Sequence, residues 1–207
     1  AIMWGWGAMN GTAVNEAANI NFPMDKFIGN WWAAGEDAVE AAGQGGIGYK
    51  AATFHGAGDD YDVYNDLKKY VYDTNKFAGN GDQWGRVLYN RGVANAIYVV
   101  EALKIAHAKY GTGVITGEQM QWALENLNLT DADIAKIGAA GLVPAVSVTC
   151  ANHEGQNPAV LIQQWDGKEY KIITDWIPAM ADLTRPILEE EAANYAKEQG
   201  ITARSCS

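Results

Sequence analysis

The stretch of residues 1–32 reads AIMWGWGAMNGTAVNEAANINFPMDKFIGNWW and places two short apolar runs on either side of a helical segment. The first run, residues 1–6, leads into a corner that contains glycine. Apolar residues then recur at helical spacing until Pro23, and the second run covers residues 26–32. This order predicts a strand, a helix and a second strand, which is the unit from which parallel sheets are built.

The same unit then repeats. Residues 36–42 predict a short helix, the GQGGIG segment at 43–48 a turn, residues 49–54 a third strand and residues 61–73 a longer helix. Strands that alternate with helices at this spacing predict an α/β fold, with a parallel sheet flanked by helices.

The middle of the chain is predicted to be helical. Residues 79–85 are rich in Gly, Asn and Asp and predict a loop, after which a long helix with a continuous apolar stripe starts at Arg86. A capping box predicts another helix start at Thr116, and a short helix is expected between Thr130 and Gly138.

The last part of the chain alternates apolar and polar residues. The segment AVLIQQWDGKEYKIIT, residues 159–174, predicts a hairpin whose turn is Asp166-Gly167, a pair favoured where both turn positions need positive φ. Residues 184–200 predict a final helix with Pro186 in its first turn.

Charge and composition exclude several classes of function. The net charge of −10 and the isoelectric point near 4.7 argue against binding to nucleic acid or to an anionic membrane surface. No apolar run approaches the roughly 20 residues of a membrane-spanning helix. The chain starts at Ala1, inside an expected strand, so we expect that a leader was removed or that a longer N-terminal part precedes it.

The corner GWGAMN resembles the dinucleotide-binding turn G-x-G-x-x-G, but its neighbours do not support that function. Asn10 stands in place of the third glycine, and Trp6 would crowd a pyrophosphate. The second strand ends in Trp31 and Trp32 rather than in the acidic residue that holds a ribose. We therefore do not predict a nucleotide site.

Two cysteines, Cys150 and Cys206, allow either one disulfide or two free thiols. Cys150 and His153 in the sequence CANH are the candidates for a nucleophile with its base, or for half a metal site. A zinc site needs further ligands at characteristic spacings, and the sequence offers none, so we expect a structural cysteine and a loop histidine. The triplets at Asn10 and Asn128 match the glycosylation pattern, and we interpret both as helix caps.

Aromatic residues follow each of the three predicted strands, in the segments GWGAMN, NWWAAGED and TFHGAGDD. Ligands of open parallel sheets bind beyond the carboxyl ends of the strands, and these ends lie at one edge. For any single tryptophan, packing in the core is an equal alternative, but the repetition favours one shared pocket. The predicted lining is Trp6, Gly7, Met9, Trp31, Trp32 and His55, with Asn10, Glu36 and main-chain amides as polar anchors.

Several segments in this order resemble the C-terminal part of a type I periplasmic solute-binding protein. The segments are WGWGAMNGTAVNEAANINFPMDKFIGNWW, GYKAATF, LYNRGVANAIYVVEALKIA, GEQMQWALENL and QQWDGKEYKI. The resemblance is to the branched-chain amino acid (leucine/isoleucine/valine)-binding class that serves ABC importers, and it covers essentially the whole chain. It implies two Rossmann-like α/β lobes that close around a small ligand in the periplasm, without catalysis, metal or cofactor, and a closed form that the importer's membrane subunits recognise.

The resemblance also implies a division of the chain. Residues 1–85 would form the core of the second lobe, residues 86–158 would cross over into helices of the first lobe, and residues 159–207 would return to the second lobe. The N-terminal strands of the first lobe are then absent, because a complete member is nearly twice as long.

One departure from the family bears on the ligand. Amino-acid-binding members place an acidic side chain where Trp31 stands, and an indole replaces only part of its hold on an ammonium group. The resemblance therefore implies an aromatic or other flat, mainly apolar compound rather than a free α-amino acid, with Arg91 available for a carboxylate. Two rival interpretations remain, a hydrolase that uses Cys150 and His153 and a sensory domain of the same fold.

Overall fold

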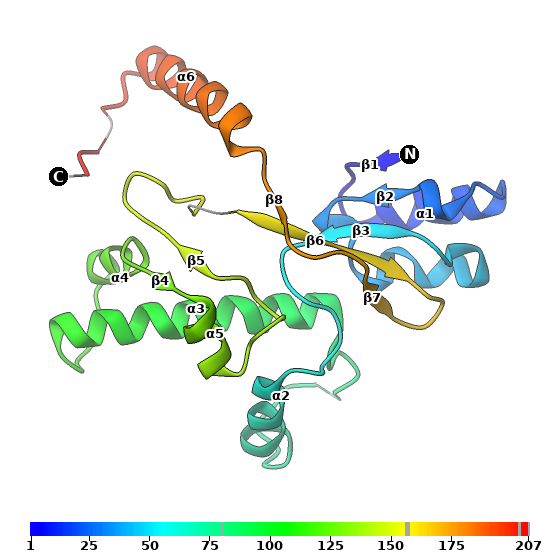
Figure 1. The fold of residues 1–207 in the computed structure, drawn as a ribbon, viewed down its shortest axis with the longest axis horizontal. Coiled ribbons are helices and arrows are strands. Elements are labelled where there is room, and N and C mark those ends of the chain that lie inside the picture. The colour runs from blue at the N-terminus through cyan, green and yellow to red at the C-terminus, as the bar shows by residue number, and fades with distance from the viewer. Residues whose placement is uncertain (80, 156–157, 203, 207) are drawn as a thin grey trace.

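A computed structural model describes residues 1–207 except Asn80, Gln156, Asn157, Ala203 and Ser207. Its main sheet has the strand order β1-β2-β3-β6-β7, with β8 paired to β6 (Figure 1). The first three strands run parallel and the later ones antiparallel, which confirms both the βαβ start and the hairpin. The strands are β1 (Ile2–Met3), β2 (Ile28–Gly29), β3 (Lys50–Thr53), β6 (Ala159–Trp165), β7 (Tyr170–Ile172) and β8 (Ile177–Pro178).

The first two strands, β1 and β2, are shorter than predicted. Helix α1 (Ala8–Asn19) starts directly after Gly7, so Asn10 lies inside the helix and the interpretation of Asn10 as a cap is wrong. After β2, the side chain of Asn30 accepts the N–H of Trp32 and begins the 3-10 turn η2 (Trp31–Ala33). The two tryptophans therefore stand on a turn beyond the strand.

The predicted helices on either side of β3 are also modified. Residues 36–46 form two 3-10 segments, η3 (Glu36–Ala38) and η4 (Glu40–Gly46), in place of an α-helix. The expected helix at 61–73 consists of α2 (Asp62–Leu67) and the π-helical η5 (Lys68–Tyr72). The expected loop at 79–85 follows, and Asn80 within it lies outside the described residues.

The helical middle of the chain agrees closely with the sequence. It contains the long α3 (Val87–Tyr110), α4 (Gly117–Leu124) and α5 (Asp131–Ile137). Thr116 and Thr130 both form complete capping boxes, which confirms the cap at the second triplet, and Gly138 ends α5 in the left-handed conformation. A small second sheet pairs β4 (Asn128–Leu129) with β5 (Val146–Ser147).

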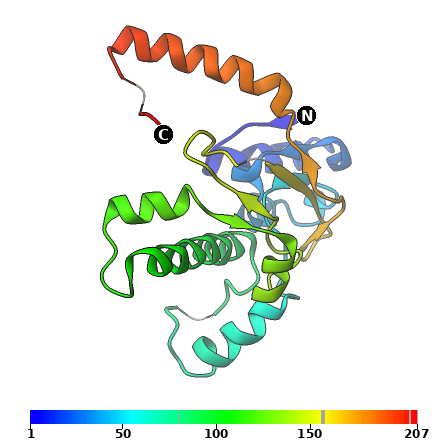
Figure 2. The same ribbon diagram turned by 60° about the vertical axis from the view of Figure 1, so that its left-hand side comes forward.

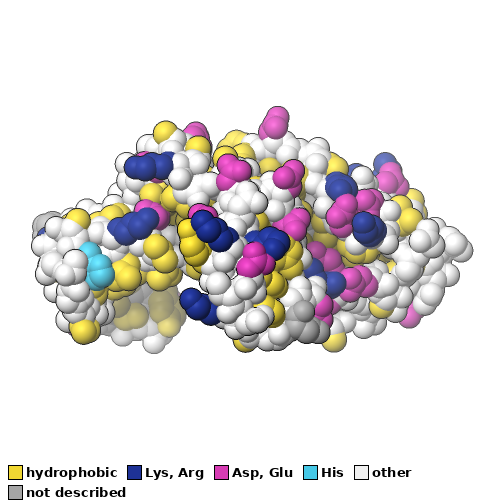
Figure 3. All heavy atoms as spheres, turned by 90° about the horizontal axis from the view of Figure 1, so that it is seen from below, with side chains coloured by type: hydrophobic (Ala, Val, Ile, Leu, Met, Phe, Trp, Pro, Cys, Tyr) yellow, Lys and Arg dark blue, Asp and Glu magenta, His cyan; other side chains and the backbone are white. Residues whose placement is uncertain are grey.

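Buried side chains form two separate cores, and α3 reaches from one to the other. Val87, at its start, belongs to the core beneath the main sheet, whereas Ala94, Ile97, Ala102 and Ala106 belong to the core around α4 and α5. Figure 1 shows the two groups of elements on opposite sides of the molecule. Where one face is seen as spheres, hydrophobic side chains lie at the surface among the charged ones (Figure 3).

The structure of the last segment differs from the sequence-based prediction in two details. Of the turn residues only Gly167 has positive φ, at 105°. The loop between β6 and β7 covers residues 166–169, and in it the Asp166 carboxylate accepts the N–H groups of Lys168 and Glu169. Helix α6 (Ala181–Gln199) begins before residue 184, so Pro186 lies in its second turn. No described side chain of α6 is buried, and the helix stands apart from the body (Figure 2).

Candidate functional site

The corner between β1 and α1 is shaped by its glycines. Gly7 has φ +53°, a conformation that side chains with a Cβ rarely adopt. A Cβ on Gly5 would overlap Met3 Cε and Asn10 Oδ1. Asn10 is buried, and its Nδ2 donates to the Trp32 carbonyl at 2.9 Å. The corner therefore ties the first strand end to the second.

Four tryptophans meet beyond these two strand ends, and we call Trp4, Trp6, Trp31 and Trp32 the tryptophan cluster. The ring centroids of Trp6 and Trp32 lie 4.6 Å apart, and Trp4 meets Trp31 edge-on at 5.5 Å. Trp4 and Trp6 are 74% and 64% exposed. The structure thus brings together the three tryptophans singled out in the sequence and adds Trp4. Met9 lies exposed on α1, near the same corner.

Arg91, on α3, extends under this cluster. Its Nη2 donates to the Trp31 carbonyl at 2.8 Å, and its guanidinium carbon lies 5.8 Å from the ring centroid of Trp32 and 5.0 Å from that of Phe54. Its Nε is buried without a hydrogen-bond partner among the described residues. Burial lowers the pKa of this guanidinium.

His55 lies in the interior behind Phe54 rather than on the surface. It is fully buried, and its Nδ1 lies 3.0 Å from the Gly56 carbonyl oxygen. Burial, with a smaller contribution from the charge of Arg91, lowers its pKa to about 4. At neutral pH the imidazole is therefore uncharged, so His55 lies beneath the site without adding a charge to it.

Glu36 has a structural partner. Its two carboxylate oxygens accept the N–H of Val87 at 3.1 and 3.2 Å, so it caps the N-terminus of α3. Partial burial raises the pKa of this carboxyl. Arg86 lies 3.9 Å away and makes a bidentate pair with Glu40, each contact 2.9 Å long. The acidic anchor expected for a ligand is therefore engaged by the helix.

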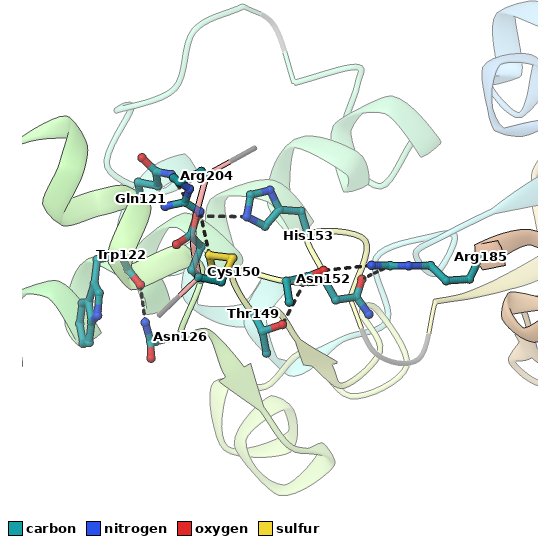
Figure 4. Close-up of polar contacts among 12 residues, drawn as sticks. Gln121, Trp122, Asn126, Thr149, Cys150, Asn152, His153, Arg185 and Arg204 are labelled. Carbon is teal, nitrogen blue, oxygen red and sulfur yellow. Dashed lines mark hydrogen bonds and ion pairs between the residues drawn. A yellow bond between two sulfur atoms is a disulfide. The ribbon is translucent and has the colours of Figure 1, made fainter. Parts of the chain in front are cut away.

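The second candidate group, around Cys150, lies elsewhere (Figure 4). Cys150 and Cys206 form a disulfide, which decides between the two alternatives left by the sequence. His153 Nε2 lies 3.0 Å from Glu125, which also pairs with Arg204 of the tail. With its sulfur in the disulfide, Cys150 has no thiol to act as a nucleophile.

None of the helices in the described part of the chain combines the length and apolar character needed to cross a bilayer. Residues 1–207, outside the five positions not described, contain no group of three or more His, Cys, Asp or Glu side chains placed to hold a metal ion.

Comparison with solved structures identifies the fold. A structure described as an ABC transporter permease from the Pseudomonas fluorescens group is 38% identical, with a TM-score of 0.92 over 100% of this chain and 50% of its own. A branched-chain amino acid ABC transporter from Thermus thermophilus with bound valine is 20% identical, with a TM-score of 0.66 over 86% of this chain and 46% of its own. The chain has the fold of a type I periplasmic solute-binding protein.

Other comparisons show how far the similarity to known proteins extends. A solute-binding protein of an ABC transporter from R. palustris, in complex with benzoate, is 13% identical, with a TM-score of 0.54 over 87% of this chain and 44% of its own. This chain spans about half the length of the solute-binding structures that it matches. No protein-family model and no curated protein sequence matches it. A possible leucine/isoleucine/valine-binding protein from Rhodopirellula baltica, 17% identical with a TM-score of 0.60, also shares the fold of this chain.

Two residues of this solute-binding fold were missed in the sequence. Phe54 packs on Arg91, and Gln163 of β6 is fully buried and donates to the Ala34 carbonyl at 2.7 Å. Gln163 falls at an inward position of the alternating strand, which was a signal for a polar role. For Phe54 the signal was its place at the end of β3, beside His55.

Proposed function

We propose that this chain is one half of an extracytoplasmic receptor that captures a small molecule between two lobes for an ABC importer. The observation that carries the proposal is the tryptophan cluster at the carboxyl ends of β1 and β2, the edge at which open α/β sheets bind ligands. The structural neighbours support a binding receptor rather than an enzyme. The disulfide agrees with an oxidising compartment such as the periplasm.

The division of the chain into lobes is part of this proposal. Residues 1–85 and 159–207 would belong to the second lobe, and residues 86–158 would belong to the first. The two cores and the passage of α3 between them support this division. An open groove along α3, lined by Leu88, Val100, Ile105 and others, is where we place the missing sheet of the first lobe, because the 38% identical structure contains as much chain again.

The ligand is proposed to be flat and mainly apolar. The indole rings offer flat apolar surface on which an aromatic ligand can stack. The nearby carboxylate of Glu36 already accepts the N–H of Val87 at the start of α3, so it is not free to bind the ammonium group of an amino acid. Capture involves no bond making or breaking. The ligand binds the closed form more tightly than the open form and so shifts the receptor toward the closed form. The membrane subunits of the importer then recognise the surface of the closed form.

The proposal is tested on the complete receptor, meaning the longer protein of which this chain is one half. A thermal-shift screen against amino acids, aromatic acids, amides and urea-like compounds should find a ligand that raises the melting temperature. A shift with branched-chain amino acids alone would contradict the proposed ligand. If no compound of any class raises the melting temperature, the proposed receptor function is contradicted.

A further inference from the structure

Two arginines at the start of α3 have opposite surroundings. Arg86 meets the carboxylates of Glu40 and Glu36. Arg91, one turn later and more deeply placed, takes part in none of the ion pairs seen among the described residues. A partly buried cation without an anion is costly, because it loses hydration and gains no counter-charge.

The rest of the site adds no compensating negative charge. Arg91 lies in the second turn of α3. The imidazole of His55 behind it is neutral, and the carboxylate nearest to the helix start, Glu36, is bound to the Val87 N–H. The partners of Arg91 are one carbonyl and two aromatic rings.

The guanidinium is nevertheless held in place. Its Nη2 is fixed to the Trp31 carbonyl, and the rings of Trp32 and Phe54 lie against it. Its buried Nε and the buried Nε2 of His55 both lack hydrogen-bond partners in the described chain. A fixed, partly desolvated guanidinium without a counter-ion matches a carboxylate, which forms charge-assisted hydrogen bonds with it.

We infer that the ligand is an aromatic carboxylate without an α-ammonium group, whose carboxylate binds Arg91 and whose ring lies against Trp31 and Trp32. This inference rests on the proposed receptor function. In the complex, the carboxylate of the ligand is the counter-ion of Arg91. An α-amino acid would add an ammonium group for which the cluster holds no unengaged carboxylate among the described residues.

The test uses matched acids and amides with the complete receptor. The probes are benzoate and benzamide, 3-phenylpropanoate and its amide, indole-3-acetate and its amide, and phenylalanine, each measured by isothermal titration calorimetry. We expect at least one acid to bind about tenfold or more tightly than its amide, because charged hydrogen bonds are stronger than neutral ones. Phenylalanine should bind more weakly than 3-phenylpropanoate.

Variants assign this preference to Arg91. Arg91→Gln should remove the preference for the acid while leaving the affinity of the amide within about threefold, and Arg91→Lys should restore part of it. Lys171→Gln, on the exposed hairpin, removes a charge away from the cluster and should change neither affinity. The comparison in the unmodified protein needs no variant, so it stands even if Arg91→Gln does not fold.

The outcomes separate this inference from the receptor function. Equal affinity for acid and amide in the unmodified protein, or an acid preference that Arg91→Gln leaves intact, overturns the inference and leaves the receptor in place. If no probe binds and the broad thermal-shift screen also finds no ligand, both the inference and the proposed function are overturned.

Discussion

Asn10 of α1 donates its Nδ2 hydrogen to the main-chain oxygen of Trp32 at 2.9 Å, across 22 residues of sequence. This bond joins α1 to the turn η2 that follows β2, next to the tryptophan cluster. Asn10 is buried.

Asn10→Ala should lower the free energy of unfolding by about 1–3 kcal/mol, because the Trp32 carbonyl loses a buried donor. Denaturant unfolding of the complete receptor measures this. Asn95→Ala, on the exposed side of α3, is the matched control and should change stability by less than about 0.5 kcal/mol. Equal effects of the two substitutions would contradict the role of Asn10.

Gly5→Ala should destabilise the protein, since the added methyl group overlaps Met3 Cε and Asn10 Oδ1. We expect a loss of about 1–3 kcal/mol, typical of overpacking. Gly92→Ala is the control, because a Cβ there meets nothing within 4 Å and alanine favours the interior of α3. The two variants should shift the melting temperature in opposite directions, and shifts of the same sign would contradict this account of the corner.

The disulfide should stabilise the C-terminal tail. It joins Cys150 to Cys206 across 56 residues, and α6 between them has no buried side chain among those described. The double variant Cys150→Ser/Cys206→Ser should lose about 2–4 kcal/mol. Before reduction, neither cysteine should react with a thiol reagent under non-denaturing conditions, and fast labelling of Cys150 would instead support the hydrolase interpretation.

Stability should fall with acid because of His55. Its pKa is about 4 when folded, against an ordinary value of 6.5, so below pH 6.5 the unfolded chain binds a proton that the folded protein does not. The stabilisation by the neutral imidazole is therefore lost progressively from pH 6.5 toward pH 4, by up to about 3 kcal/mol. His55→Gln should flatten this part of the unfolding profile, and an unchanged slope would contradict the assignment.

The meeting of the three tryptophans could be predicted, because carboxyl ends of parallel strands share one edge of a sheet. Trp4 could not, since β1 ends at Met3 and strand alternation no longer fixes where the next side chain points. The role of Glu36 also could not be predicted. It depends on the N-terminus of α3, which arrives 51 residues later in the chain.

The fold was predictable where local chemistry decides it. The capping box at Thr116, the helix start at Thr130 and the hairpin were placed correctly, because their partners lie within a few residues. The start of α1 was misplaced because it depends on the positive φ of Gly7 and on the burial of Asn10 against Trp32, which is a tertiary contact.

The most direct test of the central claim is calorimetric titration of the complete receptor and its Trp31→Ala variant with the best ligand from the screen. Tyr70→Ala, an exposed aromatic residue on η5, serves as the control. The account predicts that Trp31→Ala weakens binding by about tenfold or more while Tyr70→Ala leaves it unchanged. Equal affinity of the Trp31→Ala variant and the unmodified protein would contradict the assignment of the tryptophan cluster as the ligand site.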